Sequence, residues 1–363
     1  MSEKIHWMKK INNMPEVYVI IATWNSEKYL SDLFLSLHDM DYPKDSWHLV
    51  VVDNGSRDKT LEILSAWQVK MHNFETVIYN EANKGFAAAN NQGITYALKN
   101  SPDYIVLLND DIVVEPNWLN VMIDKMEQNK DIGLAQPLIT RYPEINKINT
   151  FGNACQFIGF GFCWLEGQDI NLTLKNYQPA YLSFSAVVIR SEVFRQIGLL
   201  DENYFSYHED SDFCFRARLQ DWNLLAVKGA IVHHRYKFPG KKNKIRYFWL
   251  EKNRYYLMLK FFKLKTLFLI APACLFMEAG QTFFSIIRGL FIQKIKAYFW
   301  ILKNFDKILT AREKIQQTRK FSDKKLFDFM SGKIEFQEIK NPLLDYIGNP
   351  LLNLYFKIIK KFI

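Results

Sequence analysis

The chain has 363 residues, of which 49% are hydrophobic and 15% aromatic, so it is not a disordered protein and is long enough for more than one domain. Residues 237–363 hold 26 Lys and Arg against 9 Asp and Glu, whereas residues 1–236 hold 21 against 29. We therefore expect an acidic globular part followed by a basic part that meets an anionic surface: a membrane, a nucleic acid or another protein.

The cysteines and the N-terminus both indicate the cytoplasm. The four cysteines show no CxxC pair and no zinc-finger spacing, so we interpret them as free thiols in a reducing compartment. The first ten residues, MSEKIHWMKK, carry charges with no apolar run behind them, which argues against a signal peptide. We expect residues 1–14 to be an extension of a chain that is made and kept in the cytoplasm.

Short apolar runs alternate with helical patterns through the first part of the chain. Strands are predicted at Val17–Ala22, His48–Val52, Glu75–Tyr79, Tyr104–Leu108 and Ala186–Arg190. Helices are predicted at Ser26–Leu37, Lys59–Val69, Gly85–Leu98, Pro116–Gln128 and Ser191–Ile197. This alternation predicts an α/β fold with a doubly wound, mostly parallel sheet.

The rest of the globular part is less regular. Thr140–Gln178 has no clear period and is expected to be a long irregular segment. A helix is expected to open within Asp201–Asp212 and to run through Leu219. Two short strands, Leu224–Ala226 and Ala230–His233, are expected to complete the sheet.

Beyond Lys237 the sequence becomes basic and aromatic. Lys237–Lys244 is expected to be a linker and Arg246–Phe262 a helix. The run Thr266–Met277 has no charge but is shorter than the roughly 20 residues that span a bilayer, and Pro272 is expected to kink a helix there. We therefore predict that residues 237–363 associate with a membrane through interfacial helices whose lysines face anionic headgroups. A soluble helical domain and a true membrane span are the alternatives.

Polar side chains follow the predicted strands at their carboxyl ends. Asp53 follows one strand, and Asn109, Asp110 and Asp111 follow another. Because parallel strands end at one edge of a sheet, we expect these residues to share a cleft. A carboxylate at Asp53 can accept from a pyrimidine imide or a ribose hydroxyl, although Asp-Asn-Gly is also a common tight turn. The acids at 110 and 111 suit Mg²⁺ or Mn²⁺ when phosphates supply the other ligands.

Further candidates for nucleotide binding flank the same strand ends. Thr23 and Asn25 end the neighbouring strand, and Asn54 stands beside the candidate carboxylate. Lys84 and Gly85 precede a helix whose N-terminus favours anionic groups, although its small residues are equally consistent with simple packing. Neither GxGxxG nor GxxxxGK[ST] occurs, so neither a dinucleotide-binding fold nor a P-loop is supported.

Three acids in four residues open the predicted helix after residue 208. Helix capping explains one of Glu209, Asp210 and Asp212 but not all three in an aromatic setting. Such a setting raises a carboxyl pKa and suits a general base. Arg216 lies within two turns and can pair with these acids. His233, preferred to its neighbour at 234, closes the last strand and is a candidate metal ligand, although strand-end histidines are more often structural.

In order and spacing, six segments of the chain resemble family 2 glycosyltransferases of the GT-A fold, and most of all their rhamnosyltransferase-like branch. The segments are VYVIIATWN, VVDNGSRD, NKGFAAANNQG, YIVLLNDDIVVEP, AVVIRSEVFRQIGLLDENYFSYHEDSDFCFRAR and VHH. The resemblance covers roughly residues 17–236 and implies a GT-A domain over residues 15–236. It implies that Asp53 contacts the base, that Asn109 and Asp111 stand where the DxD motif holds sugar and metal, and that Asp210 is the catalytic base.

The resemblance also implies a reaction. It is single-displacement, inverting transfer of a hexosyl or rhamnosyl group from a nucleotide-diphosphate sugar, with dTDP-rhamnose favoured, to a lipid-linked glycan at the cytoplasmic side of the membrane. The expected cofactor is Mg²⁺ or Mn²⁺, held by Asp111 and His233, and Asp131–Tyr142 and Thr150–Trp164 are candidate loops that exclude water. Instead of the QxxRW motif of processive members the chain has only Gln220-Asp221-Trp222, which implies one sugar per encounter.

Two other functions are open at this point. A catalytically inactive module of the same fold would bind a nucleotide sugar or a glycan without transferring it. A nucleotidyltransferase would need a glycine-rich basic loop near the N-terminus, which Ala22–Ser26 does not provide. Nucleic acid is not an expected partner, because the lysines of the C-terminal part alternate with a large apolar surface better suited to lipid.

Overall fold

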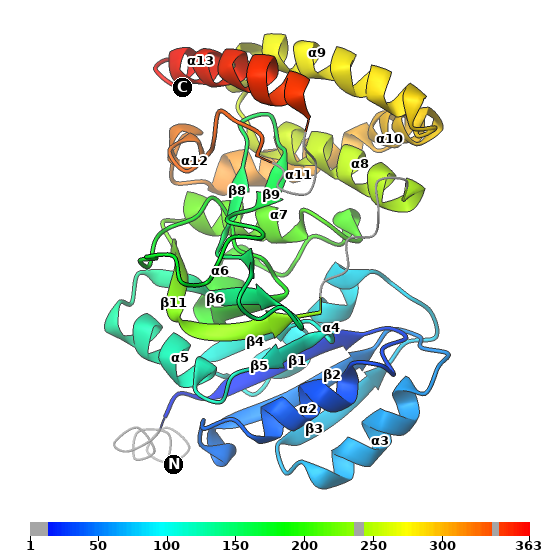
Figure 1. Cartoon of the computed structure of the whole chain (residues 1–363), viewed down its shortest axis with the longest axis vertical. Coiled ribbons are helices and arrows are strands. Elements are labelled where there is room, and N and C mark those ends of the chain that lie inside the picture. The colour runs from blue at the N-terminus through cyan, green and yellow to red at the C-terminus, as the bar shows by residue number, and fades with distance from the viewer. Residues whose placement is uncertain (1–13, 236–242, 336–340) are drawn as a thin grey trace.

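A mixed sheet forms the centre of the molecule in the computed structural model, which describes residues 14–235, 243–335 and 341–363 (Figure 1). Its nine strands run in the order β3-β2-β1-β4-β10-β6-β11-β5, with β7 paired to β6. The first strands are β1 (Val17–Thr23), β2 (Trp47–Asp53), β3 (Phe74–Tyr79), β4 (Tyr104–Leu108) and β5 (Ile112–Val114). The others in the main path are β6 (Ile132–Arg141), β10 (Ala186–Arg190) and β11 (Asn223–His234). Strands β3, β2, β1 and β4 are parallel, whereas β10 runs antiparallel between β4 and β6.

Helices cover both faces of this sheet. One face carries α2 (Leu30–His38), α3 (Thr60–Lys70) and α5 (Trp118–Gln128), whose apolar residues pack with Val19 and Val51. The other carries α4 (Phe86–Leu98), α6 (Ser191–Ile197) and α7 (Glu209–Leu219), which pack with Ile20 and Val50. Alternate residues of each central strand thus enter opposite cores, as two-sided burial requires. The predicted α/β fold is confirmed.

Two predictions between residues 131 and 234 were wrong. Asp131–Tyr142 is not a loop over the site, because it contains β6, a central strand with nine of its ten residues buried. The last strand is one element of 12 residues, β11, with a register shift between Val227 and Ile231, rather than two short strands. The segment predicted to be irregular, Thr140–Gln178, contains three short strands after the end of β6: β7 (Ile148–Thr150), β8 (Asn153–Cys155) and β9 (Gly161–Cys163).

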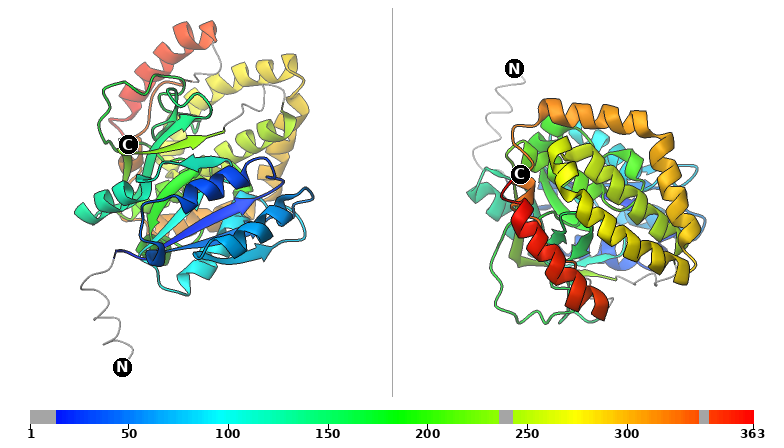
Figure 2. Two further views of the ribbon diagram at one scale, coloured as in Figure 1. Left: turned by 60° about the horizontal axis from the view of Figure 1, so that its bottom comes forward. Right: turned by 90° about the horizontal axis from the view of Figure 1, so that it is seen from above.

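The C-terminal helices lie at the end of the molecule opposite β1–β3 (Figure 1). They are α8 (Lys244–Phe261), α9 (Leu264–Ile287), α10 (Phe291–Lys303), α11 (Phe305–Thr318), α12 (Lys324–Phe327), a π-helical turn (Leu344–Gly348) and α13 (Asn349–Ile359). Helix α8 is the innermost: its Phe261 packs edge-on against Phe215 of α7. Figure 2 shows α9 and α13 together on the outer surface. The predicted linker lies largely outside the described residues, as does the predicted N-terminal extension.

Helix α9 is a single helix of 24 residues, although it contains Pro272. The helix expected to be kinked by Pro272 is thus continuous from Leu264 to Ile287. In the described part of the chain, α9 alone is long and apolar enough to cross a membrane, judged by length and composition.

Candidate active site

Thr23, Asp53 and Asp110 lie at the carboxyl ends of three neighbouring strands. Thr23 ends β1 opposite Asp53 at the end of β2, and Asp110 follows β4 on the other side of β1. Asp53 is 2% exposed, and one of its oxygens accepts from the amides of Gly55 and Ser56, both at 3.2 Å. Its other oxygen has no hydrogen-bond partner among the described residues. A buried acceptor of this kind suits a ligand N–H or O–H.

Asp110 ties the segment after β1 to the end of β4. Its carboxylate accepts from the amide of Trp24 at 3.3 Å and from the hydroxyl of Ser26. Partial burial, together with the negative charge of Asp111, raises the pKa of Asp110 to about 6. Because its hydrogen bonds reach Trp24 and Ser26, the Asp110 side chain fixes the ends of β1 and β4 relative to each other.

The turn before α4 joins the end of β2 to the loop that precedes α7. The side chain of Asn54 donates to the carbonyl of Gly85 at 3.3 Å and accepts from the amide of Lys84 at 3.0 Å. Gly85 has a φ of +91°, and a Cβ there would lie 2.7 Å from the ring of Phe205. The turn before α4 and the loop before α7 are in direct contact here, and only glycine permits so close an approach.

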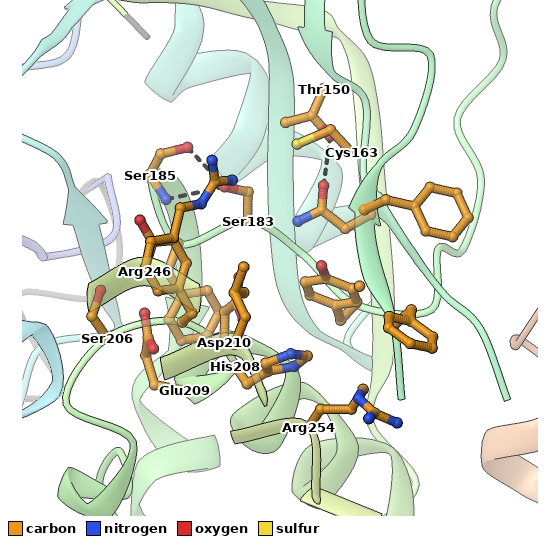
Figure 3. Close-up of a pocket in the computed structure, with 18 of the residues that line it drawn as sticks. Thr150, Cys163, Ser183, Ser185, Ser206, His208, Glu209, Asp210, Arg246 and Arg254 are labelled. Atoms are coloured by element: carbon orange, nitrogen blue, oxygen red, sulfur yellow. Dashed lines mark hydrogen bonds between the residues drawn. The ribbon is translucent and has the colours of Figure 1, made fainter. Parts of the chain in front are cut away.

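A pocket of about 590 Å³ lies beside these strand ends (Figure 3). Its sheet side includes Asn109, Ser183, Ser185, Glu209, Asp210 and His234, and its α8 side includes Arg246, Tyr247, Leu250, Glu251 and Arg254. Figure 3 places Glu209, Asp210 and Arg246 in the same part of the pocket. The C-terminal region thus contributes a wall of the candidate site.

Asp210 has the environment of a general base. It is partly exposed in the pocket, and one carboxylate oxygen accepts from the amide of Ser211 at 2.7 Å. Burial raises the pKa of Asp210 to about 7, while burial and the charge of Asp210 raise the pKa of Glu209 to about 8. A carboxyl group that titrates near neutrality can take a proton from a hydroxyl and release it again.

The two histidines at the end of β11 point to opposite faces of the sheet. Both ring nitrogens of His233 are engaged at 2.7 Å, one by the hydroxyl of Thr140 and the other by the carboxylate of Glu115. His234 lines the pocket, and its Nε2 lies 3.2 Å from Oδ1 of Asp111. The structure therefore places His234, rather than the predicted His233, beside Asp111.

A chain of polar contacts sets the tautomer of His234. Glu166 accepts hydrogen bonds from Arg141 at 2.8 Å and from the Asn149 amide at 2.9 Å. Because Asn149 turns its NH₂ group to Glu166, its carbonyl oxygen faces Nδ1 of His234 at 2.9 Å and must accept from it. Nε2 is then the ring nitrogen that faces Asp111, and it can donate there only if it carries a second proton.

This arrangement fits a divalent cation. Oδ1 of Asp111 has no hydrogen bond among the described residues, and it faces the Nε2 atom of His234. Two acceptors this close need a proton or a cation between them. No group of three or more His, Cys, Asp or Glu side chains in the described ranges is arranged to hold a metal. Mg²⁺ and Mn²⁺ nevertheless need few protein ligands where phosphate oxygens complete the shell.

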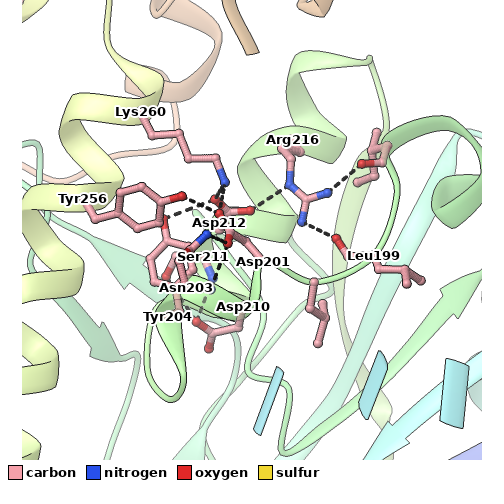
Figure 4. Close-up of polar contacts among 12 residues, drawn as sticks. Leu199, Asp201, Asn203, Tyr204, Asp210, Ser211, Asp212, Arg216, Tyr256 and Lys260 are labelled. Atoms are coloured by element: carbon pink, nitrogen blue, oxygen red, sulfur yellow. Dashed lines mark hydrogen bonds and ion pairs between the residues drawn. The ribbon is translucent and has the colours of Figure 1, made fainter. Parts of the chain in front are cut away.

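Asp212 and Arg216 lie behind the pocket rather than in it. Asp212 is fully buried and pairs with Arg216 at 2.7 Å on one side and with Lys260 of α8 on the other (Figure 4). The guanidinium of Arg216 also donates to the carbonyls of Ile197 and Leu199. These two residues hold α7 in place and do not reach a ligand in the pocket.

The sequence profile of glycosyl transferase family 2 matches residues 18–198. The chain belongs to this family. It is 25% identical over 215 residues to the low-salt glycan biosynthesis hexosyltransferase Agl10 of Haloferax volcanii, covering 58% of this chain and 64% of that protein. It is 30% identical over 148 residues to the poly(ribitol-phosphate) beta-N-acetylglucosaminyltransferase TarS of Staphylococcus aureus, covering 38% and 26%.

Solved glycosyltransferases share the fold of this chain. GalNAc-T7 with UDP, GalNAc and Mn²⁺ matches with a TM-score of 0.57 and 17% identity, over 70% of this chain and 49% of that one. The mannosyltransferase PcManGT from Pyrobaculum calidifontis with GDP-Man and Mn²⁺ matches with a TM-score of 0.51 and 13% identity, over 99% and 93%. At these identities the likeness concerns the fold.

The predicted site residues of this chain fall into three groups. Asn109, Glu209 and Asp210 line the pocket. Asp111 contacts His234, which also lines it. Thr23, Asn25, Asp53, Asn54, Lys84, Gly85 and Asp110 lie at the adjoining strand ends and turns, where Asn25 is exposed and its side chain accepts from the amide of Arg57 at 2.8 Å. His233, Asp212 and Arg216 are engaged elsewhere. Asn149, Glu166 and Arg246, which also line the pocket, carry no recognisable signal in the sequence.

Proposed function

We propose that the chain is an inverting, non-processive glycosyltransferase that moves a hexose or rhamnose from a nucleoside-diphosphate donor to a lipid-linked glycan. The observation that carries the proposal is the meeting, in one pocket, of Asp210 with His234 and its neighbour Asp111. The transferase part would be residues 15–236, and residues 237–363 would attach it to the membrane.

The proposed donor lies along the strand ends. The unpartnered oxygen of Asp53 would accept from the imide N–H of a pyrimidine, which favours a uracil or thymine base. Asn109 would contact the sugar, and Asp111 with His234 would hold Mg²⁺ or Mn²⁺. When bound, such a cation offsets the charge of the diphosphate. The two structural neighbours named above support this assignment, since one holds UDP, GalNAc and Mn²⁺ and the other holds GDP-Man and Mn²⁺.

The proposed reaction is a single displacement. The carboxylate of Asp210 takes the proton of an acceptor hydroxyl, whose oxygen forms a bond to the anomeric carbon. The bond from that carbon to the diphosphate oxygen breaks, and the diphosphate leaves with the electron pair. Attack opposite the leaving group inverts the anomeric configuration. The apolar lining contributed by Phe160, Phe162 and Phe184 would exclude water, which competes with the acceptor.

The outer surface of the C-terminal helices supports membrane attachment. Helix α9 exposes apolar side chains: Leu264, Phe268, Leu275, Phe283 and Ile287 are each more than 60% exposed. Its one acid, Glu278, turns inward and pairs with Lys294 of α10. An apolar outer face with its charge inside is the reverse of a surface helix in water. On α13, Leu351, Leu354 and Ile358 extend this surface, and Lys357 and Lys360 lie nearby for anionic headgroups.

The function is tested with full-length protein and a panel of nucleotide sugars. Thermal shift with and without Mn²⁺ identifies the donor, and transfer to lipid-linked acceptors in vesicles measures turnover. We expect stabilisation by UDP- or dTDP-sugars, transfer that requires the cation, and a product of inverted configuration by NMR. Donor binding without turnover on any acceptor would instead identify an inactive binding module.

A further inference from the structure

Helix α8 holds the loop that leads to the candidate base. Four residues on one side of α8 contact the segment 201–212: Lys252, Asn253, Tyr256 and Lys260. Lys252 donates to the carbonyl of Asn203. Tyr256 and Lys260 bind the carboxylate of Asp201 at 2.7 and 2.6 Å (Figure 4). This contact joins the C-terminal region to the start of α7, beyond the residues that the family profile matches.

The loop held in this way has an unfavourable backbone conformation. Phe205, Tyr207 and His208 have φ values of +64°, +69° and +70°, although none is glycine. Residues with side chains adopt this region rarely, and they persist in it only where the surrounding structure imposes the conformation. Glu209 and Asp210 follow immediately, so the conformation of this loop decides where the carboxylate of Asp210 lies.

Asn253 satisfies the carbonyl groups of this loop. Its side chain is fully buried, and Nδ2 lies 3.2, 2.8 and 2.6 Å from the carbonyl oxygens of Tyr204, Ser206 and Tyr207. All three neighbours are acceptors, so the orientation of the amide is unambiguous. The carbonyl of Tyr204 also accepts from the amide of Ser206 at 2.8 Å, whereas those of Ser206 and Tyr207 accept from Asn253. Carbonyl groups that converge on one point need a donor there, and Asn253 supplies it.

We propose that Asn253 is a positioning residue for catalysis: its amide holds residues 204–208 in the conformation that presents Asp210 to the acceptor. The proposal rests on the base role proposed for Asp210. Asn253 touches neither substrate nor pocket and acts only through the loop. Its loss should therefore affect the chemical step and the protonation of Asp210 more than donor binding, since the loop meets the strand-end site through the contact of Phe205 with Gly85 while Asp53 and Asp111 are held by other segments.

The test compares Asn253→Ala and Asn253→Asp with Tyr255→Phe in the full-length chain. Asp fills the same volume but has no donor to offer, whereas Tyr255→Phe removes a hydrogen bond from the side of α8 that contacts Glu278. We expect the Asn253 variants to lose roughly 10- to 100-fold in kcat, since small displacements of a reacting group have such effects. Donor Kd should stay within about twofold and the pH midpoint of kcat should move, while Tyr255→Phe stays near wild type.

Amide hydrogen exchange over residues 204–210 is the readout that needs no activity. Exchange there should be faster in both Asn253 variants than in Tyr255→Phe. An unchanged kcat and unchanged exchange overturn the proposal, as do equal losses of kcat and donor affinity in all three variants, which would indicate general destabilisation. If the wild-type chain transfers no sugar, the proposed function fails, and the exchange rates still decide whether Asn253 holds the loop.

Discussion

The Nε2 atom of His234 lies 3.2 Å from a carboxylate oxygen of Asp111. With Nδ1 donating to Asn149, Nε2 faces the carboxylate of Asp111 either as the N–H donor of an imidazolium or, in the neutral ring, with its lone pair, and a cation between the two groups would favour the second form. The pair joins the end of β11 to the segment after β4, and so joins the pocket to the proposed diphosphate site.

His234→Ala should weaken Mn²⁺ binding at least tenfold, because imidazole is a good ligand for this metal and few protein ligands are present. His233→Ala is the matched control: its ring contacts Thr140 and Glu115, so its loss should cost stability and leave metal affinity within about twofold. Calorimetric titration of Mn²⁺ in the presence of a nucleoside diphosphate measures both. The opposite ranking of the two variants would restore His233 as the ligand.

Asn149→Leu should also weaken Mn²⁺ binding, by roughly 10- to 100-fold, although Asn149 would not touch the metal. Its carbonyl fixes the ring orientation and tautomer of His234, and partners of this kind affect metal affinity to that extent. Asn176→Leu, which removes an exposed asparagine bonded to the amide of Lys228, serves as the control. Equal metal affinity in the two variants would show that the polar chain is structural only.

Asp210→Asn should reduce kcat at least a hundredfold and leave donor affinity nearly intact, since the amide cannot accept the acceptor proton. In the wild-type enzyme kcat should rise as the pH rises through about 7, where Asp210 loses its proton. Pre-steady-state turnover across pH, with calorimetry of donor binding, checks both statements. Parallel losses in turnover and donor affinity would count against the base role.

The same raised pKa has an effect on stability. Between the ordinary value of 3.8 and about 7, the folded protein retains a proton on Asp210 that the unfolded chain has released, so stability falls as the pH rises through this range. Above pH 7 Asp210 is ionised in both the folded and the unfolded state, so the loss of stability no longer grows with pH. Asp210→Asn should therefore melt a few degrees higher than wild type at pH 8 and close to it at pH 4. Scanning calorimetry at the two pH values measures the difference.

The strand ends of the proposed nucleotide site were predictable because their signals are local. Asp53 and Asn109 each follow a buried β-branched or aliphatic run, and such runs mark strands of a parallel sheet. The strand β6 was missed because Gly133, Gln136 and Pro137 interrupt its apolar pattern, and only the fold shows that they are buried in the sheet.

The site residues that were misplaced depend on geometry that residue spacing does not give. The side of a strand residue alternates, and the register shift in β11 changes the count, so His233 and His234 could not be told apart. Asp210 and Asp212 are two residues apart on a helix and so face different directions, which sends Asp212 to Lys260 instead of the pocket. Asn149 and Asn253 act through tertiary contacts with segments about 50 to 85 residues away.

The proposed membrane attachment through α9 and α13 predicts which substitutions would release the protein. Phe268→Glu and Leu354→Glu alter side chains that are 81% and 60% exposed. Each should weaken binding to anionic vesicles about 10- to 100-fold, which corresponds to the free energy of burying one large apolar side chain. Val69→Glu on α3, 89% exposed at the opposite end of the molecule, should leave binding unchanged. Vesicle co-sedimentation at low and high salt measures all three. Equal vesicle binding by all variants would refute attachment through this surface.

Phe268 and Leu354 lie outside the pocket, so their substitution should separate membrane binding from catalysis. Transfer to a soluble acceptor analogue should persist in both variants, while transfer to a vesicle-bound acceptor should fall.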